Sequence, residues 1–364
     1  MLITGTDFND GAVNYSTCHF VEKERYEQDK HIQIKNGSIL ITKDGTLGKV
    51  AYVQGLSMPA TLNAGVFNVE IKDETKVDNK YLFQYLKAPF LMDYVDKKAT
   101  GGTIKHLNQN ILVDFPVVMP SKAEQEAIGV YFQQLDNLIT LHQRKYDKLT
   151  NVKKSMLEKM FPKNGSNVPE IRFKGFSDAW EQRKVGELLI ERNEQAPMNE
   201  EYPLMAFIAN EGVAPKGERY DRSSLVTDTE NKLYKRTEFG DFIYSSNNLE
   251  TGSIGLNKYG KACISPVYSI FHPTGIADSN FLGRRLVRKD FINSMVKWRQ
   301  GVIYGQWRIH ESDFLKIEIS VPSVKEQRQI GTFLDYLDNL ITLHQRELEK
   351  LKNLKKACLE KMFV

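Results

Sequence analysis

The sequence predicts an α+β fold in which two mixed α/β globules are separated by two long antiparallel coiled-coil helices, as a pseudo-twofold internal repeat. Three observations lead to this prediction: a near-identical repeat of 42 residues, a heptad pattern inside each copy, and strand-like segments ahead of both copies. The chain has 364 residues, of which 41% are hydrophobic and 26% are charged, so it can build more than one hydrophobic core.

The internal repeat aligns residues 120–161 with residues 322–363 without a gap. Of the 42 aligned positions 26 are identical, and ten consecutive residues from Leu135 recur unchanged from Leu337. Identity over such a run is far beyond chance and divides the chain into alternating globules and helices. The predicted parts are a first globule at 1–120, a helix at 121–161, a linker at 162–170, a second globule at 171–322 and a second helix at 323–364.

Each copy of the repeat is predicted to form one long helix. A capping box begins each copy, with Ser121 and Glu124 in the first and Ser323 and Glu326 in the second. Apolar residues then follow at alternating steps of four and three, the spacing of a coiled coil. We expect the two helices to pair with each other, and the alternative is that they are unrelated core helices of separate globules.

Polar residues interrupt this apolar seam at equivalent places. Lys153 and Lys355 each break the heptad pattern once, and His142 and His344 both occupy seam positions. If the helices pair antiparallel about a point near their middles, the two histidines lie close together. We expect them to set the register of the pair rather than to bind a metal.

The globules carry short strand patterns that repeat more faintly. Residues 36–48 and 239–255 both predict a strand, a glycine turn and a second strand, and residues 114–120 and 316–322 predict a last strand before each helix. Gly255 and Gly260 resemble part of a phosphate-binding loop, but the flanking strand patterns favour a β-hairpin. The first globule lacks a counterpart of residues 171–202, which include a predicted helix around 185–193, so it is expected to be short at its N-terminal side.

Charge and cysteine content narrow the class of protein. The net charge is +4 overall but −1 for residues 1–120 and +1 for residues 171–322, so any nucleic-acid surface must be a local patch. Cys18, Cys263 and Cys358 show no C-x-x-C spacing, which predicts neither disulfides nor a zinc site and fits a reducing cytoplasm. There is no apolar run long enough for a membrane span and no signal-peptide pattern, so we expect a cytoplasmic protein without a membrane partner.

No pattern of catalytic residues emerges from the sequence. Neither an H-E-x-x-H nor a G-x-S-x-G motif is present, and Glu70 and Lys72 form half of a nuclease signature without a suitably placed second carboxylate. We therefore expect no catalytic residue, no metal and no cofactor in this chain.

Two kinds of loop are suited to nucleic acid, because short amides, hydroxyls and basic side chains can reach base edges and phosphates. The first kind is a polar turn, with candidates Ser245, Ser246, Asn247, Asn248 and Ser253 in the second globule and Lys43, Thr46 and Lys49 in the first. The second kind precedes the last strand, with candidates Lys97, Lys98, Thr103, Lys105 and His106 in the first globule and Arg299, Tyr304, Gln306, Trp307 and Arg308 in the second. Arg284 and Arg285 belong to a further basic cluster, which could equally be a solvated face.

Two divergent globules joined by near-identical helices resemble the specificity subunit of a type I restriction–modification system. The resemblance covers essentially the whole chain. It is carried by residues 120–129 and 322–331, by the Leu-Asp-x-Leu-Ile helices that follow them, and by residues 171–180, which resemble the usual opening of a recognition domain.

This resemblance implies two target recognition domains that each bind one half of a split DNA site, with the helices setting the gap between the halves. It also implies a non-catalytic subunit whose partners are double-stranded DNA, two modification subunits and restriction subunits. S-adenosylmethionine, ATP and magnesium would be bound by those partner subunits. Two other readings stay open from the residues alone: a structural adaptor with protein-binding globules, and a self-sufficient nuclease or methyltransferase.

Overall fold

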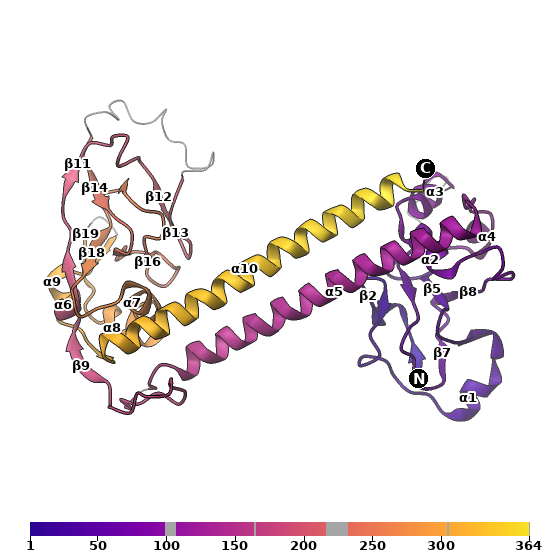
Figure 1. Cartoon of the computed structure of the whole chain (residues 1–364), viewed down its shortest axis with the longest axis horizontal. Helices are drawn as coiled ribbons and strands as arrows, with labels where there is room; N and C mark the ends of the chain where they lie inside the picture. Colours follow the sequence, from indigo (N-terminus) through magenta and orange to yellow (C-terminus); the bar gives the residue numbers. More distant parts are fainter. Residues whose placement is uncertain (99–106, 164, 216–231, 304–305, 364) are drawn as a thin grey trace. The chain divides into compact units, whose positions relative to one another are not determined.

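The computed structural model describes residues 1–98, 107–163, 165–215, 232–303 and 306–363. The chain forms two compact units (Figure 1). Unit 1 contains Met1–Tyr146 and His344–Val364, and unit 2 contains Asp147–Leu343. Each unit therefore combines one globule with parts of both long helices.

Unit 1 contains a five-stranded sheet in the order β2-β3-β6-β5-β8 and a three-stranded sheet in the order β1-β7-β4. At the centre of the larger sheet, β5 pairs antiparallel with both β6 and β8, and its side chains are fully buried. The predicted strand, turn and strand of this region are confirmed by the β5–β6 pair. The strands are β1 (Leu2–Ile3), β2 (Phe8–Asn9), β3 (Ala12–Val13), β4 (Gln33–Ile34), β5 (Ile39–Thr42), β6 (Val50–Tyr52), β7 (Ala60–Leu62) and β8 (Val66–Val69).

Two helices that carry aromatic side chains, α2 and α3, cover the five-stranded sheet of unit 1. The apolar faces of α2 and α3 pack with residues of β5 and β6 and with the first turns of α5 into one core. Burial of these faces supplies most of the stability of such short helices. The shorter helices are α1 (Lys23–Gln28), α2 (Asn79–Lys87), α3 (Phe90–Lys98) and α4 (Gln109–Val113), with 3-10 turns at Gly5–Asp7 and Lys30–Ile32.

Unit 2 is built from smaller antiparallel sheets. The largest has the order β10-β18-β15-β16, a second has the order β11-β14-β17, and three two-stranded sheets pair β12 with β13, β19 with β20, and β9 with β21. The strands are β9 (Glu181–Lys184), β10 (Leu189–Glu191), β11 (Gln195–Ala196), β12 (Ala206–Ile208), β13 (Gly212–Ala214), β14 (Tyr234–Thr237), β15 (Phe242–Tyr244), β16 (Ile254–Leu256), β17 (Ala262–Ile264), β18 (Ser269–Pro273), β19 (Gln300–Ile303), β20 (Gln306–Arg308) and β21 (Glu318–Val321). Its short helices are α6 (Val185–Leu188), α7 (Ser279–Arg285), α8 (Lys289–Val296) and α9 (Glu311–Phe314).

Three local predictions are corrected by this fold. Gly255 and Gly260 do not lie in a hairpin, because β16 pairs with β15 whereas β17 pairs with β14 in another sheet. The helix predicted around 185–193 ends at Leu188, where β10 begins. The last strand before the helix exists in unit 2 as β21 but not in unit 1, where residues 116–119 are irregular; β21 has β9 as a partner, and a strand without a partner is not stable.

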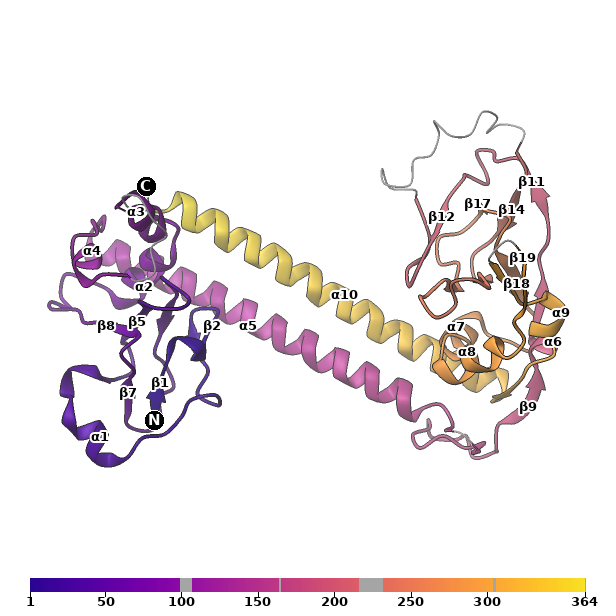
Figure 2. The same ribbon diagram turned by 180° about the vertical axis from the view of Figure 1, so that it is seen from behind.

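The two long helices are α5 (Lys122–Lys159) and α10 (Val324–Lys361), each 38 residues long, as the repeat predicts. In unit 1 the beginning of α5 and the end of α10 lie side by side in both views (Figures 1 and 2). The predicted seam positions Ile128, Phe132 and Leu135 are buried there, as are Ile330, Leu334 and Leu337 in unit 2. Among the described residues, no helix is both long and apolar enough to cross a bilayer.

Candidate nucleic-acid interface

In unit 2 the two loops proposed from sequence lie next to each other. The backbone N–H of Ile309, directly after β20, donates to the Oγ of Ser246 in the β15–β16 turn at 3.1 Å. Arg299, at the start of the other loop, holds Glu250 of the turn by two bonds of 3.1 and 2.8 Å. A bidentate pair of this kind fixes both distance and orientation, so the turn and the β19–β20 hairpin form one surface.

Unit 1 is constructed in the same way. The backbone N–H of Leu107 donates to the carbonyl oxygen of Lys43 at 2.9 Å. Leu107 is the counterpart of Ile309 at the repeat offset, and both side chains are buried. The β5–β6 turn of unit 1 is therefore attached to the end of its own second loop, as the β15–β16 turn is in unit 2.

Backbone bonds shape both turns and leave some side chains exposed. Ser245 and Ser253 are buried and join through a 2.8 Å backbone bond, so they support the turn of unit 2, whereas Asn248 is exposed and Asn247 half-buried. In unit 1 the hydroxyl of Thr42 bonds the carbonyl of Thr46 and accepts the N–H of Lys49 at 2.9 Å. The side chains of Thr46 and Lys49 are exposed, and Lys43 lies over the ring of Phe67 with its Nζ 4.9 Å from the centroid.

The basic candidates of the second loops are only partly described. Lys97 and Lys98 end α3 and are exposed, with the Nζ of Lys98 5.5 Å from the ring centroid of Tyr94. Cations also stabilise a helix C-terminus, which gives these lysines a structural role as well. Arg308 is exposed at the end of β20. Thr103, Lys105, His106 and Tyr304 lie outside the described residues, and only the backbones of Gln306 and Trp307, in β20, are described.

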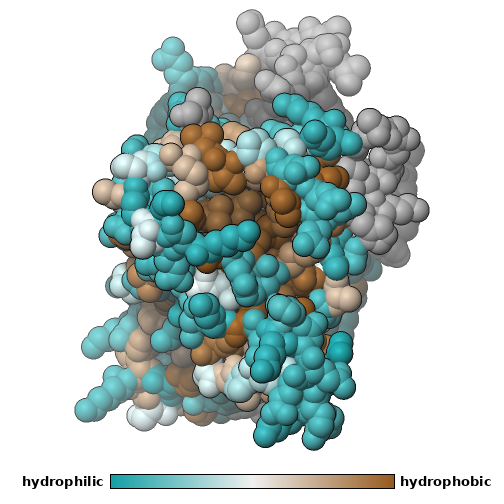
Figure 3. Space-filling model, turned by 90° about the vertical axis from the view of Figure 1, so that its right-hand side faces the viewer, coloured by the Kyte–Doolittle hydropathy of each residue, from teal (hydrophilic) through white to brown (hydrophobic). Residues whose placement is uncertain are grey.

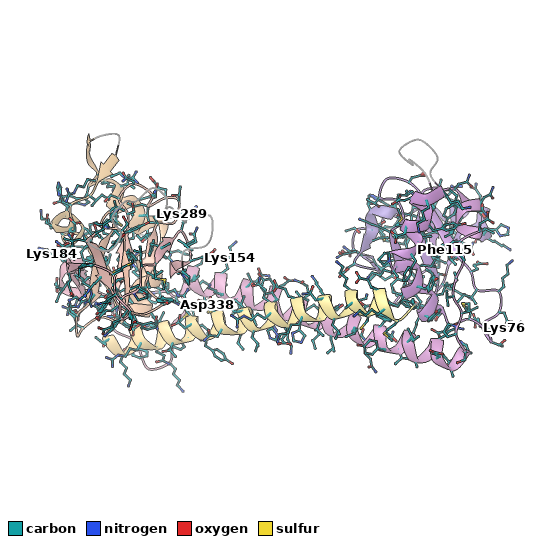
Figure 4. All side chains as sticks on the ribbon, turned by 90° about the horizontal axis from the view of Figure 1, so that it is seen from above. Lys76, Phe115, Lys154, Lys184, Lys289 and Asp338 are labelled. Carbon is teal, nitrogen blue, oxygen red and sulfur yellow. The ribbon has the colours of Figure 1, made fainter. Side chains whose placement is uncertain are left out.

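The arginine cluster around α7 is engaged within unit 2. The guanidinium of Arg284 bonds Asp335 at 2.9 Å and also bonds Asp338, both on α10; Asp338 is labelled in Figure 4. Arg285 pairs with Asp290 at 3.0 Å, and burial lowers its pKa. Because carboxylates already neutralise these two side chains, they are weaker candidates for phosphate contacts than the exposed residues of the turns.

Each globule joins its own long helix through the same set of bonds, which sequence reasoning did not single out. In unit 1 the Oε1 of Gln125 accepts the N–H of Asp78 at 3.0 Å, and its Nε2 donates to the carbonyls of Lys76 and Pro120. In unit 2 the Oε1 of Gln327 accepts the N–H of Asp278 at 3.0 Å in the same way.

A glycine completes each of these junctions. A Cβ on Gly129 would lie 2.8 Å from Asp78 Oδ1 and 3.0 Å from the backbone nitrogen of Tyr81, and Gly331 faces equivalent atoms of the α7 N-terminus. The bonds and the glycine together explain why the motif Pro-Ser-x-x-Glu-Gln-x-x-Ile-Gly stands at both places. Its presence in both copies was the signal that could have identified these residues.

The far end of each long helix enters the core of the other globule. Phe161, after α5, contacts Trp180 and Phe281 in unit 2, with centroids 6.0 and 5.6 Å away. Phe363, after α10, is buried in unit 1 and stacks on Phe132 at 5.7 Å. Each globule is thus completed by the helix that begins at the other one.

The lysines that interrupt the seam form equivalent ion pairs between the helices. In unit 1 Lys355 bonds Asp136 at 2.5 Å, and in unit 2 Lys153 bonds Asp338. The interruptions therefore stabilise the helix pair, because they match a cation with a carboxylate at each site. Lys355 also acts on a neighbouring lysine: burial, followed by the charge of Lys355, lowers the pKa of Lys87 to about 8.

The two seam histidines meet as expected. The Nδ1 atoms of His142 and His344 are 3.2 Å apart within unit 1. Burial, then the charge of His142, then that of Lys145 lower the pKa of His344. Among the described residues no group of three or more histidines, cysteines and carboxylates could hold a metal ion.

The family comparison decides between the readings left open by the residues. The family described as type I restriction modification DNA specificity domain matches residues 3–151 and 177–353. The chain belongs to this family. It is a DNA sequence-recognition subunit of a type I restriction–modification system, and not itself an enzyme.

Individual relatives agree with this assignment. A protein of Methanocaldococcus jannaschii assigned as the specificity subunit of the type I restriction enzyme MjaX is 23% identical, covering 96% of this chain and 82% of its own length. The MjaVIII specificity subunit of the same organism is 24% identical over 90% and 78% of the two chains. The crystal structure of a type I restriction–modification S subunit from M. genitalium shares the fold, with a TM-score of 0.59, 16% identity and coverage of 100% of this chain and 88% of that one.

Proposed function

We propose that each globule of this specificity subunit is a target recognition domain that reads one half of a bipartite DNA site. The observation that carries the proposal is the joined pair of loops that each unit presents. Both units attach a polar turn to a second loop through a backbone N–H: that of Leu107 donates to the carbonyl of Lys43, and that of Ile309 donates to the hydroxyl of Ser246. The two units fill these loops with different side chains. A shared framework with different reading residues suits two different half-sites.

We further propose the division of labour within each surface. Asn247 and Asn248 are the candidates for base edges in unit 2, because asparagine can bind adenine through two bonds. Lys43, Thr46, Lys49, Lys97 and Lys98 in unit 1, and Arg308 in unit 2, are candidates for phosphate contacts. Arg299 positions the turn through Glu250. The candidates Thr103, Lys105, His106, Tyr304, Gln306 and Trp307 stay proposals from the sequence.

The helices α5 and α10 are proposed to form an antiparallel coiled-coil spacer that sets the gap between the half-sites. Their outer faces are the proposed docking surfaces for two modification subunits, with restriction subunits joining the same complex. S-adenosylmethionine, ATP and magnesium would then act in those partners, in the cytoplasm. Two near-identical helices support this proposal because they offer two near-identical surfaces.

Methylation mapping tests the proposal directly. The chain is expressed with its modification subunit in a host free of adenine methylation, and the genome is sequenced for N6-methyladenine. A split motif with a constant gap is expected. A continuous motif would contradict the two-domain reading, and a complex without DNA affinity would favour a structural adaptor.

Variants then assign each half-site to a unit. Asn247→Ala with Asn248→Ala should relax one half of the motif, by about 1–3 kcal/mol per lost base contact, and leave the other half unchanged. Lys184→Ala is the matched control, because this exposed side chain lies on β9 of the same unit (Figure 4). Relaxation of both halves would contradict the assignment of one unit to one half.

A further inference from the structure

A single acidic residue, Glu250, stands in the β15–β16 turn of unit 2, which spans residues 245–253. Its side chain is 57% exposed. Exposed polar side chains are common on protein surfaces, as the hydrophilic ones around the apolar centre of the face of unit 1 in Figure 3 illustrate, and most of them are only solvated. Glu250 differs because its neighbours fix both its position and its charge.

The carboxylate of Glu250 is held by Arg299, whose side chain is only 12% exposed. The Nη1 of Arg299 donates to Oε1 of Glu250 at 3.1 Å, and its Nη2 donates to Oε2 at 2.8 Å. Two parallel bonds of this kind fix the plane of a carboxylate as well as its distance. Each oxygen uses one of its two lone pairs on Arg299, so each keeps one for a donor outside the protein.

The backbone on both sides of Glu250 is fixed as well. Leu249, directly before it, is fully buried in the core of unit 2. After it, the carbonyl of Gly252 accepts the backbone N–H of Asn210 at 3.0 Å, and the N–H of Gly252 donates to the carbonyl of Leu249 at 3.2 Å. A side chain that is ordered before binding loses little conformational entropy on binding, so Glu250 is preorganised for a partner.

Unit 1 joins its two loops without this ion pair. At the repeat offset Gly48 stands in the place of Glu250, and the exposed Lys97 stands in the place of Arg299. The loops of unit 1 are nevertheless joined through the backbone N–H of Leu107. The ion pair therefore belongs to the part of the surface that differs between the units, where the residues that distinguish two half-sites are expected.

The charge of Glu250 limits what this residue can bind. The hydrogen bond from Arg299 lowers the pKa of Glu250, so the carboxylate is ionised near neutral pH and only accepts hydrogen bonds. It repels phosphate groups, which leaves the donors on base edges. In the major groove these donors are the amino groups of cytosine and adenine, but adenine places its N7 acceptor beside the amino group, whereas cytosine presents the amino group alone.

We propose that Glu250 is a specificity-determining residue that accepts a hydrogen bond from the N4 amino group of a cytosine, and that Arg299 is its positioning residue. The inference rests on the proposed function, in which unit 2 reads one half of a split DNA site. Asn247 and Asn248 of the same turn offer both donors and acceptors, as adenine requires. With Glu250 the turn can also recognise cytosine.

Competition binding with DNA duplexes tests the proposal on the complex of the full chain with its modification subunit. The split motif found by methylation mapping supplies the duplex, and each position of the motif then carries the four base pairs in turn. A cytosine is expected at one position of the half-site that Asn247→Ala with Asn248→Ala relaxes. At that position Glu250→Gln should lower the preference for cytosine about tenfold and raise that for adenine, because glutamine matches adenine N6 and N7.

Two further variants separate base reading from a structural effect. Arg299→Lys keeps the positive charge but not the planar pair of donors, so it should weaken the preference for cytosine without a gain for adenine. Glu318→Gln is the matched control for the change of charge and should leave every preference unchanged, because this exposed side chain lies on β21, in another sheet of unit 2. A gain for adenine in Glu250→Gln cannot arise from a loss of folding.

Two results would overturn the proposal, and they separate it from the function on which it rests. If Asn247→Ala with Asn248→Ala relaxes one half-site but Glu250→Gln changes no preference for cytosine there, Glu250 is only the partner of Arg299, and this inference alone fails. If neither the asparagine variants nor Glu250→Gln change either half-site, the turn does not read DNA, and the proposed function of the turn fails as well.

Discussion

Units 1 and 2 are most alike where a globule joins its long helix and least alike in the loops proposed to meet DNA. At the junctions Gln125 and Gln327 make the same bonds, and Gly129 and Gly331 meet the same atoms. In the loops, unit 1 presents lysines and a threonine where unit 2 presents asparagines and arginines. The comparison teaches that the two copies share the residues that attach a globule to its long helix, whereas the side chains of the proposed DNA-binding loops differ between the copies.

The two units also complete each other. Each core ends on a phenylalanine that the other half of the sequence supplies, Phe363 in unit 1 and Phe161 in unit 2. Neither half of the chain therefore contains a complete core of its own, which couples the folding of the two halves. Four predictions follow from this arrangement, ordered by the size of the expected effect.

The largest effect is expected from replacing either of these two phenylalanines with alanine. Phe161→Ala should destabilise unit 2 by about 3–5 kcal/mol and Phe363→Ala should destabilise unit 1 by a similar amount, because each leaves a cavity in an aromatic core. Hydrogen exchange resolved by peptide should show faster exchange in unit 2 for Phe161→Ala and in unit 1 for Phe363→Ala. Met362→Ala is the control, since that side chain is exposed. Faster exchange in unit 1 for Phe161→Ala would break the comparison.

The next effect concerns the junction glycines. Gly129→Ala and Gly331→Ala should each destabilise their unit by about 1–3 kcal/mol, because the added methyl meets backbone atoms at the start of α2 or α7. The gain in helix propensity, about 1 kcal/mol, offsets only part of this. Denaturant unfolding measures both. Gly275→Ala, whose Cβ would meet open space, should be nearly neutral; a large difference between the two junction variants would show that the junctions are not equivalent.

A smaller effect is expected from the two interhelical ion pairs, which should differ in how much they stabilise their units. Asp338 accepts bonds from Lys153 and Arg284, whereas Asp136 accepts from Lys355 and the amide of Gln84. Although burial opposes it, the bond from Lys153 and the charge of Arg284 lower the pKa of Asp338. Asp338→Asn should therefore destabilise unit 2 by about 2 kcal/mol and Asp136→Asn should destabilise unit 1 by about 1 kcal/mol.

Thermal unfolding of the two asparagine variants measures this difference. Glu158→Gln, on the exposed face of α5, provides a reference for a charge change on a helix surface. Equal losses for the two variants would show that the extra guanidinium at Asp338 adds nothing, and would make the helix pair symmetric in energy as well as in sequence.

The sequence was most informative about these helices. Their length and the meeting of His142 with His344 could be predicted from the repeat, because a helix depends on the local spacing of residues in the sequence. Of each predicted capping box the structure has the serine bond, to the N–H of Glu124 and of Glu326, whereas the carboxylate of Glu326 bonds Arg172 instead. The final phenylalanines could not be placed, since the spacing of Phe161 says nothing about which core receives it. The strand expected at residues 116–119 failed for a related reason: a strand depends on a partner elsewhere in the chain.

The candidate site likewise has features that the sequence could predict and features that it could not. The turns with Lys49 and Asn248 were found from composition and glycine spacing, and their role in DNA contact stays a prediction. Arg284 looked like part of a phosphate surface, because the sequence does not reveal that Asp335 and Asp338 face it from a helix some fifty residues away. Local sequence therefore cannot show that a charged side chain is neutralised by residues far away in the chain.

The smallest effect tests the histidine pair of unit 1. Because the pKa of His344 is lowered in the folded chain, the unfolded chain binds more protons near pH 6, and stability must rise with pH. The contribution of His344 to the free energy of folding is fully present above the pKa of histidine in the unfolded chain, about 6.5, and is lost as the pH falls below that pKa. His344→Asn should therefore reduce the drop in melting temperature between pH 8 and pH 5.5, which thermal unfolding at the two pH values measures. An unchanged drop in His344→Asn would contradict this linkage and would leave the histidine pair with a role in the register of the helices alone.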